Sequence, residues 1–347
     1  MSLGPLMVGV SGLTLSAEER EMLRHPLIGG VILFTRNYQN PEQLAALVTA
    51  IHGLKDSPLL VAVDHEGGRV QRFRDGFVAL PPMRPLGRLY DKDAKKAKRF
   101  SHLLGWLMAA ELRAVGIDLS FAPVLDLDCG TSEVIGDRAF HGDPEAVADL
   151  AHAFMLGMDL AGMRAVGKHF PGHGTAAADS HLVVVTDNRP FEDIAAADLV
   201  PFERMIDYGL PALMAAHVVY PRVDAKPAGF SRFWMQEVLR GGLGFQGAIF
   251  SDDLGMAGAG TAGDIAQRAE AALEADCDML LLCNELAAIP PLLNHLEGYR
   301  NPASQLRLAR LHGRGKIDRT RLRLEPNWRD ALQAVAECGR PDEPNLV

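Results

Sequence analysis

Short and almost wholly apolar runs recur along the chain, and each is followed by a segment with helical periodicity. The runs are continuously apolar rather than alternating, which is typical of strands buried on both faces of a parallel sheet. There are eight of them: Leu6–Val10, Gly30–Phe34, Leu59–Asp64, Ile117–Phe121, Ala165–His169, Ala212–Val218, Ala248–Ser251 and Asp278–Cys283.

The segments between these runs carry helix signals. An apolar stripe at helical spacing begins at Phe100, and Gly116 closes that helix. Asp143 and Pro144 supply an N-cap and a proline at the first position of another helix. Eight strand–helix units predict a (β/α)₈ TIM barrel in the α/β class, formed by a single domain. A doubly wound open sheet is the alternative, but no GxGxxG follows the first strand.

The end of the chain differs from the barrel pattern. We expect residues 1–300 to form the catalytic barrel and residues 301–347 to form a helical or irregular extension packed on it, with breaks at Pro302 and Pro326. Eight lysine and arginine residues lie between Arg300 and Arg323. Such a run is usually a solvated surface, and a docking surface for an acidic ligand is the alternative.

Composition excludes several classes of protein. The chain has 347 residues, 48% of them hydrophobic, and a formal net charge of −9, which argues against a nucleic-acid partner. No lysine or arginine precedes Arg20, so the N-terminal stretch lacks the basic region typical of a signal peptide. No apolar run approaches the roughly 20 residues that a membrane span needs. The four cysteines show no metal-ligand spacing. We therefore expect a cytoplasmic protein without a membrane or nucleic-acid partner. A monomer acting on a small molecule is our further expectation, although composition does not determine the oligomeric state.

Polar residues stand where the predicted strands end. The third strand ends in Asp64, the fifth in Lys168 and His169, and the seventh runs into Asp252 and Asp253. The sixth reaches His217 and the eighth runs into Asn284. Active sites of (β/α)₈ barrels lie at the C-terminal ends of the strands, so this pattern supports the fold and the site together.

The stretch KHFPGHGTAAADSH, residues 168–181, concentrates ionisable groups after the fifth strand. Its proline and glycines forbid a regular helix, which predicts a loop carrying Asp179 and His181. A loop of this composition is typical of a catalytic segment.

A metal site is the first chemistry to consider here. His169 and His173 are separated by Pro171-Gly172, so they cannot lie one turn apart on a helix as in HExxH sites. The first strand carries no ligand either. We therefore expect no metal and no other cofactor.

Carboxylates and cations suggest a different chemistry. Adjacent strand residues point to opposite faces, so alternation predicts that only one of Asp252 and Asp253 faces the substrate, without saying which. A carboxylate at the mouth of a barrel is typically a nucleophile or a stabiliser of positive charge. Further groups that can form hydrogen bonds with hydroxyls or anions are Asp64, Arg72 and Arg138. Together these groups favour a polar ligand the size of a sugar.

Four motifs together resemble the family 3 glycoside hydrolases. They are DHEGGRVQRF (64–73), GDRAF (136–140), KHFPGHG with DSH (168–181) and IFSDDLGM (249–256). The resemblance extends from about Leu6 to Asn284, and the C-terminal tail carries no motif of the family.

The resemblance implies a role for individual residues. Asp252 corresponds to the catalytic nucleophile, His181 to the general acid/base, and Asp179 to the partner that orients the imidazole. Substrate binding would fall on Asp64, Arg72, Arg138, Lys168 and His169.

The resemblance also implies a reaction. It is closest to bacterial members that remove terminal β-linked N-acetylglucosamine with retention of configuration. Their substrate would be a cell-wall fragment, N-acetylglucosamine linked β-1,4 to anhydro-N-acetylmuramic acid, with or without peptide. Two alternatives from other classes are a metal-dependent amidohydrolase and a non-catalytic sugar-binding barrel.

Overall fold

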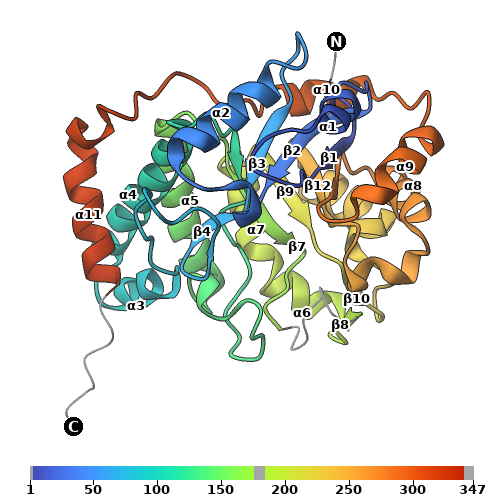
Figure 1. Ribbon diagram of the computed structural model, residues 1–347. Helices are drawn as coiled ribbons and strands as arrows, with labels where there is room; N and C mark the ends of the chain where they lie inside the picture. Colours follow the sequence, from blue (N-terminus) through green and yellow to red (C-terminus); the bar gives the residue numbers. More distant parts are fainter. Residues whose placement is uncertain (1–2, 176–183, 340–347) are drawn as a thin grey trace.

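Eight parallel strands form a barrel at the centre of the molecule (Figure 1). The computed structural model describes residues 3–175 and 184–339. Each of the eight predicted runs overlaps one barrel strand: β1 (Leu6–Val8), β2 (Ile28–Leu33), β3 (Leu60–Val63), β6 (Leu119–Ser120), β7 (Val166–Phe170), β9 (Ala212–Ala215), β12 (Ala248–Asp253) and β13 (Met279–Leu282). Their order in the sheet is β6-β3-β2-β1-β13-β12-β9-β7.

The barrel closes between β6 and β7. The Val166 amide donates to the Ala122 carbonyl at 2.8 Å, and the Leu125 amide donates to the Lys168 carbonyl at 2.7 Å. Two isolated parallel bridges, Leu119 with Arg164 and Val124 with Lys168, join the same edges. These contacts confirm the predicted (β/α)₈ barrel over the doubly wound open sheet, because an open sheet would leave two unpaired edges.

Two apolar layers explain why the strand runs are uninterrupted. In β1, Leu6 and Val8 belong to the layer between strands and helices, whereas Met7 belongs to the layer inside the barrel. Phe121 and Phe250 meet edge to face inside, with ring centroids 5.3 Å apart. Strand side chains alternate with a period of two, so an all-apolar run is required when both faces are buried.

Helices form the outer ring of the barrel. They include α1 (Ala17–Leu23), α2 (Pro41–His52), α3 (Arg84–Lys92), α4 (Ala94–Arg113), α5 (Pro144–Leu160), α6 (Phe191–Ala196), α7 (Leu199–Asp207), α8 (Ile265–Glu274) and α9 (Ile289–His295), together with a π-helical segment at Phe233–Gly242. None of the helices described is long and apolar enough to cross a membrane.

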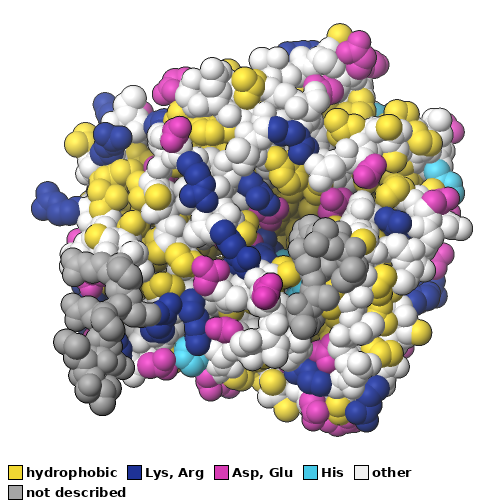
Figure 2. All heavy atoms as spheres, turned by 60° about the horizontal axis from the view of Figure 1, so that its bottom comes forward, with side chains coloured by type: hydrophobic (Ala, Val, Ile, Leu, Met, Phe, Trp, Pro, Cys, Tyr) yellow, Lys and Arg dark blue, Asp and Glu magenta, His cyan; other side chains and the backbone are white. Residues whose placement is uncertain are grey.

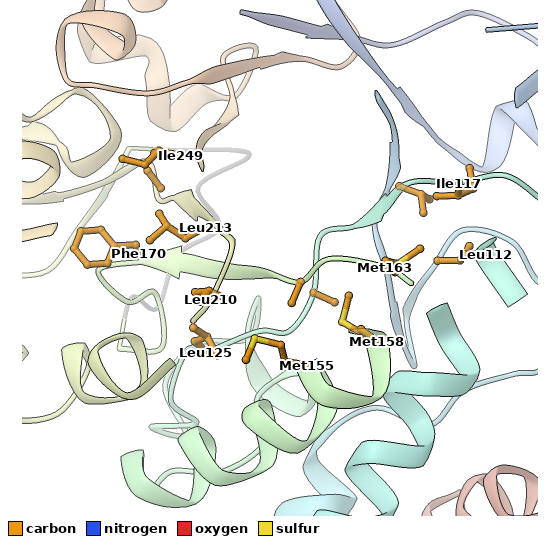
Figure 3. Packing of buried hydrophobic residues seen from close by; sticks show 14 of the residues in the cluster. Leu112, Ile117, Leu125, Met155, Met158, Met163, Phe170, Leu210, Leu213 and Ile249 are labelled. Atoms are coloured by element: carbon orange, nitrogen blue, oxygen red, sulfur yellow. The ribbon is translucent and has the colours of Figure 1, made fainter. Parts of the chain in front are cut away.

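Local sequence sets the start and the packing of α5. The Asp143 side chain accepts from the Ala146 amide at 2.9 Å, as the N-cap signal predicts. Gly157 lies so close to α4 that a Cβ there would stand 2.0 Å from the His102 carbonyl oxygen. On its inner side, Met155 and Met158 point toward the strands and the connections between them (Figure 3).

Two helices follow the barrel at the C-terminal end, α10 (Pro302–Ala309) and α11 (Pro326–Cys338). Ser304 Oγ donates to the buried Asp278 carboxylate at 2.6 Å, which joins α10 to the start of β13. Helix α11 packs along α4, where Lys96 Nζ lies 2.6 Å from Glu337 Oε2 (Figure 1). The helical extension is therefore present, and a domain boundary at residue 300 stays a prediction.

Glu111 is an acid that α4 buries between the barrel and the C-terminal segment. Its side chain is 4% exposed, and both carboxylate oxygens accept from the Val78 amide, at 3.3 and 3.0 Å. Burial raises the pKa of Glu111 to about 7, against smaller lowering effects of the Val78 amide and of Arg319. Its charge therefore opposes folding once the pH exceeds the pKa of the carboxyl group in the unfolded chain.

Replacing Glu111 with Gln should change how stability depends on pH. The cost of the buried charge begins near the unfolded pKa of about 4.3 and is complete above pH 7, so Glu111→Gln should gain about 2 kcal/mol relative to the unmodified protein between pH 5 and pH 8. Urea unfolding at the two pH values measures this. The exposed Glu203→Gln is the matched control, and equal pH dependence in the two variants would contradict the burial argument.

Candidate active site

A cavity of about 280 Å³ opens at the C-terminal ends of the barrel strands. Figure 2 shows this face of the molecule, with a hollow bordered by lysine and arginine side chains. Six of the eight residues predicted from the sequence line this cavity: Asp64, Arg72, Arg138, Lys168, His169 and Asp252. The structure thus brings together residues that lie up to 188 positions apart in the chain, counting from Asp64 to Asp252.

The floor of the cavity is a chain of alternating charges. Lys168 Nζ lies 2.9 Å from Asp64 Oδ1 and 2.6 Å from Glu66 Oε1. Glu66 in turn accepts two hydrogen bonds from Arg138, from Nε and Nη2, both at 2.8 Å. Arg72 Nη2 stands 3.7 Å from Asp64 Oδ2 at the outer end of the chain.

Each buried group of this chain is held in its charged form by its neighbours. Burial alone raises the pKa of Glu66, but Arg138 and Lys168 outweigh that effect and leave it far below its ordinary value. Burial lowers the pKa of Lys168, and the carboxylates of Asp64 and Glu66 reverse the shift and raise it. The cavity therefore presents permanent charges and donors to a polar ligand.

Two tight turns place the acidic and basic partners. Glu66 lies on β4 (His65–Gly67), which forms a hairpin with β5 (Val70–Gln71) directly after β3. Gly67 has φ +120°, and a Cβ there would stand 2.4 Å from the Pro81 carbonyl oxygen, so the turn requires glycine. Arg138 lies on a short 3₁₀ helix, Gly136–Arg138.

The histidine of the HEGG sequence has a packing role. His65 is 1% exposed, and its ring lies 5.8 Å from Phe73 and 5.9 Å from Phe77. Burial lowers the pKa of His65 to about 3, so the ring is neutral. His65 anchors its own strand β4 against these two rings and does not line the cavity.

His169 is fixed by a carboxylate that the sequence analysis did not single out. Its Nδ1 lies 2.6 Å from Asp126 Oδ2, and the other oxygen of Asp126 accepts from the backbone amides of His169 and His173, at 3.2 and 2.8 Å. Burial raises the pKa of Asp126, but the nearby histidines and these hydrogen bonds bring it below its ordinary value. With Nδ1 paired to Asp126, Nε2 is the nitrogen of His169 that can meet a ligand.

A register shift explains how neighbours on β7 both reach the cavity. The pairing of β7 with β9 shifts between Lys168 and Phe170. At such an irregularity the alternation of side chains is interrupted, so Lys168 and His169 can face the same side.

Asp252 and Asp253 at the end of β12 both line the cavity, so alternation alone does not separate them. The pairing of β12 with β13 shifts between Phe250 and Asp253, which explains the departure from the expected pattern. Hydrogen bonds do separate them. Asp253 Oδ1 accepts from the backbone amides of Gly255 and Cys283 at 3.0 and 3.1 Å, and burial raises the Asp253 pKa. Asp252 Oδ1 also accepts a backbone hydrogen bond, from the adjacent Asp253 amide at 2.8 Å. Asp253 therefore holds the turn after β12 through the amides of two other segments, and Asp252 stays the candidate nucleophile that the family resemblance implies.

The other two predicted residues, Asp179 and His181, lie outside the described residues. Thr175 and Asp187, which flank that stretch in the sequence, are joined by a hydrogen bond from Thr175 Oγ1 to Asp187 Oδ2 of 2.6 Å. Arg189 reinforces the joint by donating to Asp187 at 2.7 Å, to Thr175 at 2.8 Å and to the buried Asp198 at 2.7 Å. Both flanks of residues 176–183 are thus held together beyond β7.

Sequence reasoning missed the two carboxylates that organise the site, Glu66 and Asp126. Glu66 lies within the DHEGGR motif, and an acid beside two glycines and several nearby cations was a usable signal. Asp126 is preceded by an apolar segment and carries no such signal.

His217 was expected at the mouth, but it is fully buried and does not line the cavity, and burial lowers its pKa. Asn284 does line the cavity.

Within residues 3–175 and 184–339, no group of three or more histidine, cysteine or acidic side chains is arranged to hold a metal ion. Two of the sequence-derived metal candidates, Asp179 and His181, are not among those residues. The expectation of a metal-free site stays a prediction.

Comparisons with known proteins agree on one family. The model of the glycosyl hydrolase family 3 N-terminal domain matches residues 5–311. A β-hexosaminidase of Alkalilimnicola ehrlichii is 56% identical over 96% of each chain, and one of Methylobacillus flagellatus is 53% identical over 99% of this chain and 98% of its own. A solved structure of NagZ from Neisseria gonorrhoeae, in complex with N-trifluoroacetyl-D-glucosamine, has a TM-score of 0.92 and 45% identity over 98% of this chain and 99% of that chain.

Neutralising Glu66 should destabilise the fold through the two cations that it joins. Glu66→Gln keeps the size of the side chain but leaves Lys168 and Arg138 short of a buried counter-charge, which should cost about 3 kcal/mol of unfolding free energy at pH 7. Because the Glu66 pKa is depressed, this difference should be present above about pH 4.3 and shrink as the pH falls further.

Asp137→Asn is the matched control, since Asp137 is half-exposed and its contact with Arg69 is 3.5 Å long. Urea unfolding of the three proteins at pH 7 makes the comparison. Equal stabilities for the two variants would show that the charge chain contributes little.

Proposed function

The chain belongs to glycosyl hydrolase family 3 and is a glycoside hydrolase of the β-hexosaminidase type, and from this premise we propose that it removes single N-acetylglucosamine residues from peptidoglycan fragments. The observation that carries the proposal is the cavity at the mouth of the barrel. The Asp252 carboxylate lines this cavity together with a set of fixed charges that can form hydrogen bonds with sugar hydroxyls.

The size of the cavity supports removal of one sugar at a time. Its volume of 280 Å³ lies below the roughly 300–1,000 Å³ typical of sites for drug-sized ligands. A single pyranose ring suits such a space, and a second sugar would project from the mouth. The Neisseria gonorrhoeae NagZ structure holds one N-acylated glucosamine derivative. The closed floor, formed by Glu66, Lys168 and Arg138, favours an enzyme acting on chain ends.

The proposed reaction has two displacements. The Asp252 carboxylate attacks the anomeric carbon while the glycosidic oxygen leaves with a proton from His181, which gives a covalent glycosyl-enzyme. Water then attacks the same carbon and gives its proton to His181, and Asp252 departs as the carboxylate. Two inversions produce net retention. In this scheme Asp179 orients the imidazole and supports its cationic form, as a triad carboxylate does.

The bound sugar is proposed to rest on the charge chain. Asp64 accepts hydrogen bonds from ring hydroxyls, while Arg72, Arg138, Lys168 and His169 donate to them. These side chains are already fixed by one another, so binding need not order them. The protein acts on a small carbohydrate, and we propose that it does so as a cytoplasmic monomer.

A panel of aryl β-glycosides tests the substrate class. N-acetylglucosaminide should be cleaved far faster than glucoside, and the disaccharide N-acetylglucosamine-β-1,4-anhydro-N-acetylmuramic acid should be cleaved with retention. Absence of turnover with tight sugar binding would favour the non-catalytic barrel. Activity lost on prolonged chelation and restored by zinc would favour a metal-dependent hydrolase.

Asp252 should carry the sugar in the covalent intermediate. A fluorinated N-acetylglucosamine analogue that is released slowly should add its mass to the peptide containing Ser251–Leu254, with fragmentation placing it on Asp252. Asp252→Asn should lower kcat/KM at least about 1,000-fold, because no other carboxylate replaces the attacking group.

The neighbouring aspartate provides the control. Asp253→Asn should still form the covalent adduct, with lower stability, since Asp253 Oδ1 holds two backbone amides. Label on Asp253, or inversion of the product anomer, would contradict the assignment of the nucleophile. Release of an oxazoline would indicate participation of the substrate's acetamido group instead.

The need for His181 should grow with the basicity of the leaving group. A general acid strongly assists departure of a sugar alkoxide and assists an activated phenolate little, so His181→Ala should lose most activity on the disaccharide and much less of its glycosylation rate on a dinitrophenyl glycoside. The glycosyl-enzyme should then accumulate, and azide should speed its turnover. Asp179→Asn should show the same pattern more weakly. If His181 has only a structural role, both substrates should lose activity equally and azide should rescue neither.

A further inference from the structure

Arg36 is an arginine fixed at the edge of the cavity by three oxygens from two parts of the barrel rim, the ends of β1 and β13. It lies on a short 3₁₀ helix, Thr35–Asn37, directly after β2. Its Nε donates to the Val10 carbonyl at 3.0 Å, its Nη2 to the Cys283 carbonyl at 2.9 Å and its Nη1 to Asn284 Oδ1 at 2.9 Å. The guanidinium is therefore held in place, although Arg36 is an exposed residue.

The charge of Arg36 is not neutralised by this chain as far as the structure describes it. All three oxygens that hold it are neutral, and no carboxylate of residues 3–175 and 184–339 forms an ion pair with it. In contrast, Lys168 and Arg138 each face a carboxylate at 2.9 Å or less. A positioned cation without an anion is suited to receive one from a ligand.

An aromatic face lies beside this cation. The Arg36 guanidinium carbon is 4.5 Å from the centroid of the Phe34 ring, and that of Arg72 is 5.8 Å from it. Phe34, Cys283 and Asn284 line the cavity, whereas Arg36 borders it from outside. Because Arg36 is not among the lining residues, the part of a ligand that meets it is the part that projects from the mouth past Phe34.

We propose that Arg36 binds a carboxylate on the leaving part of the substrate, with the Phe34 ring as the surface against which that part rests. This proposal rests on the proposed function and adds a specificity for acidic leaving groups. The ion pair would form outside the cavity, so it would act on substrates with two or more units and not on aryl glycosides. This ion pair would lie at a partly solvated rim, so it would be weaker than an ion pair in a buried site.

The test compares one substrate with its charge present and masked. The charged substrate is the N-acetylglucosamine-β-1,4-anhydro-N-acetylmuramic acid disaccharide. The uncharged substrate is the same disaccharide with the carboxylate of its anhydro-N-acetylmuramic acid unit converted to a methyl ester. For the unmodified enzyme, kcat/KM should be higher for the acid than for the ester. Arg36→Gln should lower this acid-to-ester ratio about tenfold, mainly through KM for the acid, because a charge-assisted hydrogen bond is lost. Arg36→Lys should retain most of the ratio.

Arg321→Gln is the control for total charge, since Arg321 is 80% exposed in the C-terminal segment and pairs locally with Asp318. Its ratio should equal that of the unmodified enzyme. An unchanged ratio in Arg36→Gln would overturn the proposal, even if both substrates slow down, because that pattern indicates only a structural role. If Arg36→Gln fails to fold, the unmodified enzyme provides the test. Its acid-to-ester ratio of kcat/KM should fall as salt is added, and a ratio near one at low salt would overturn the proposal.

The two proposals fail in different ways. If the aryl N-acetylglucosaminide and both disaccharides are left intact, the proposed function fails. If all three are cleaved and the ratio does not respond to Arg36 or to salt, only the role of Arg36 fails.

Discussion

The ionic chain through Asp64, Lys168, Glu66 and Arg138 is the constraint on which the site depends. It joins the end of β3, the β4 hairpin, the turn after β6 and strand β7. The inner three side chains are almost fully buried, so each charge must keep its neighbour or leave an uncompensated charge in a poorly solvated place. No strand end in this group can move alone. The charges of the cavity floor are consequently paired with one another without a ligand.

Around this floor, neighbouring polar residues have separate tasks. Asp252 and Asp253 both line the cavity, but Asp253 also holds the amides of Gly255 and Cys283, and Asp126 fixes the ring of His169. In each pair one side chain holds backbone or a neighbouring ring, and the other is the residue proposed to act on the substrate. Phe34 and Arg36 extend the same arrangement to the rim, where a fixed cation stands beside an aromatic face.

Much of this could be predicted from residue patterns, and the errors have physical reasons. Each of the eight apolar runs overlaps a strand, because a strand buried on both faces must be apolar throughout. The N-cap at Asp143 could also be predicted from the sequence, because the N-cap hydrogen bond joins residues only three positions apart. The missed groups, Glu66 and Asp126, depend on partners 72 and 43 residues away. The local sequence therefore does not predict which buried acid pairs with which cation.

What the sequence determined by itself was the set of strands, their order along the chain and the kind of side chain at each strand end. These follow from periodicity and from turn chemistry, which act over a few residues. Only the tertiary structure decided how those ends combine. Closure between β6 and β7 sets which ends are neighbours, and register shifts at Lys168 and Phe250 set which side chains face inward. Pairing of charges across the barrel depends on that closure, because burial makes the pairing necessary only where the closed barrel excludes water.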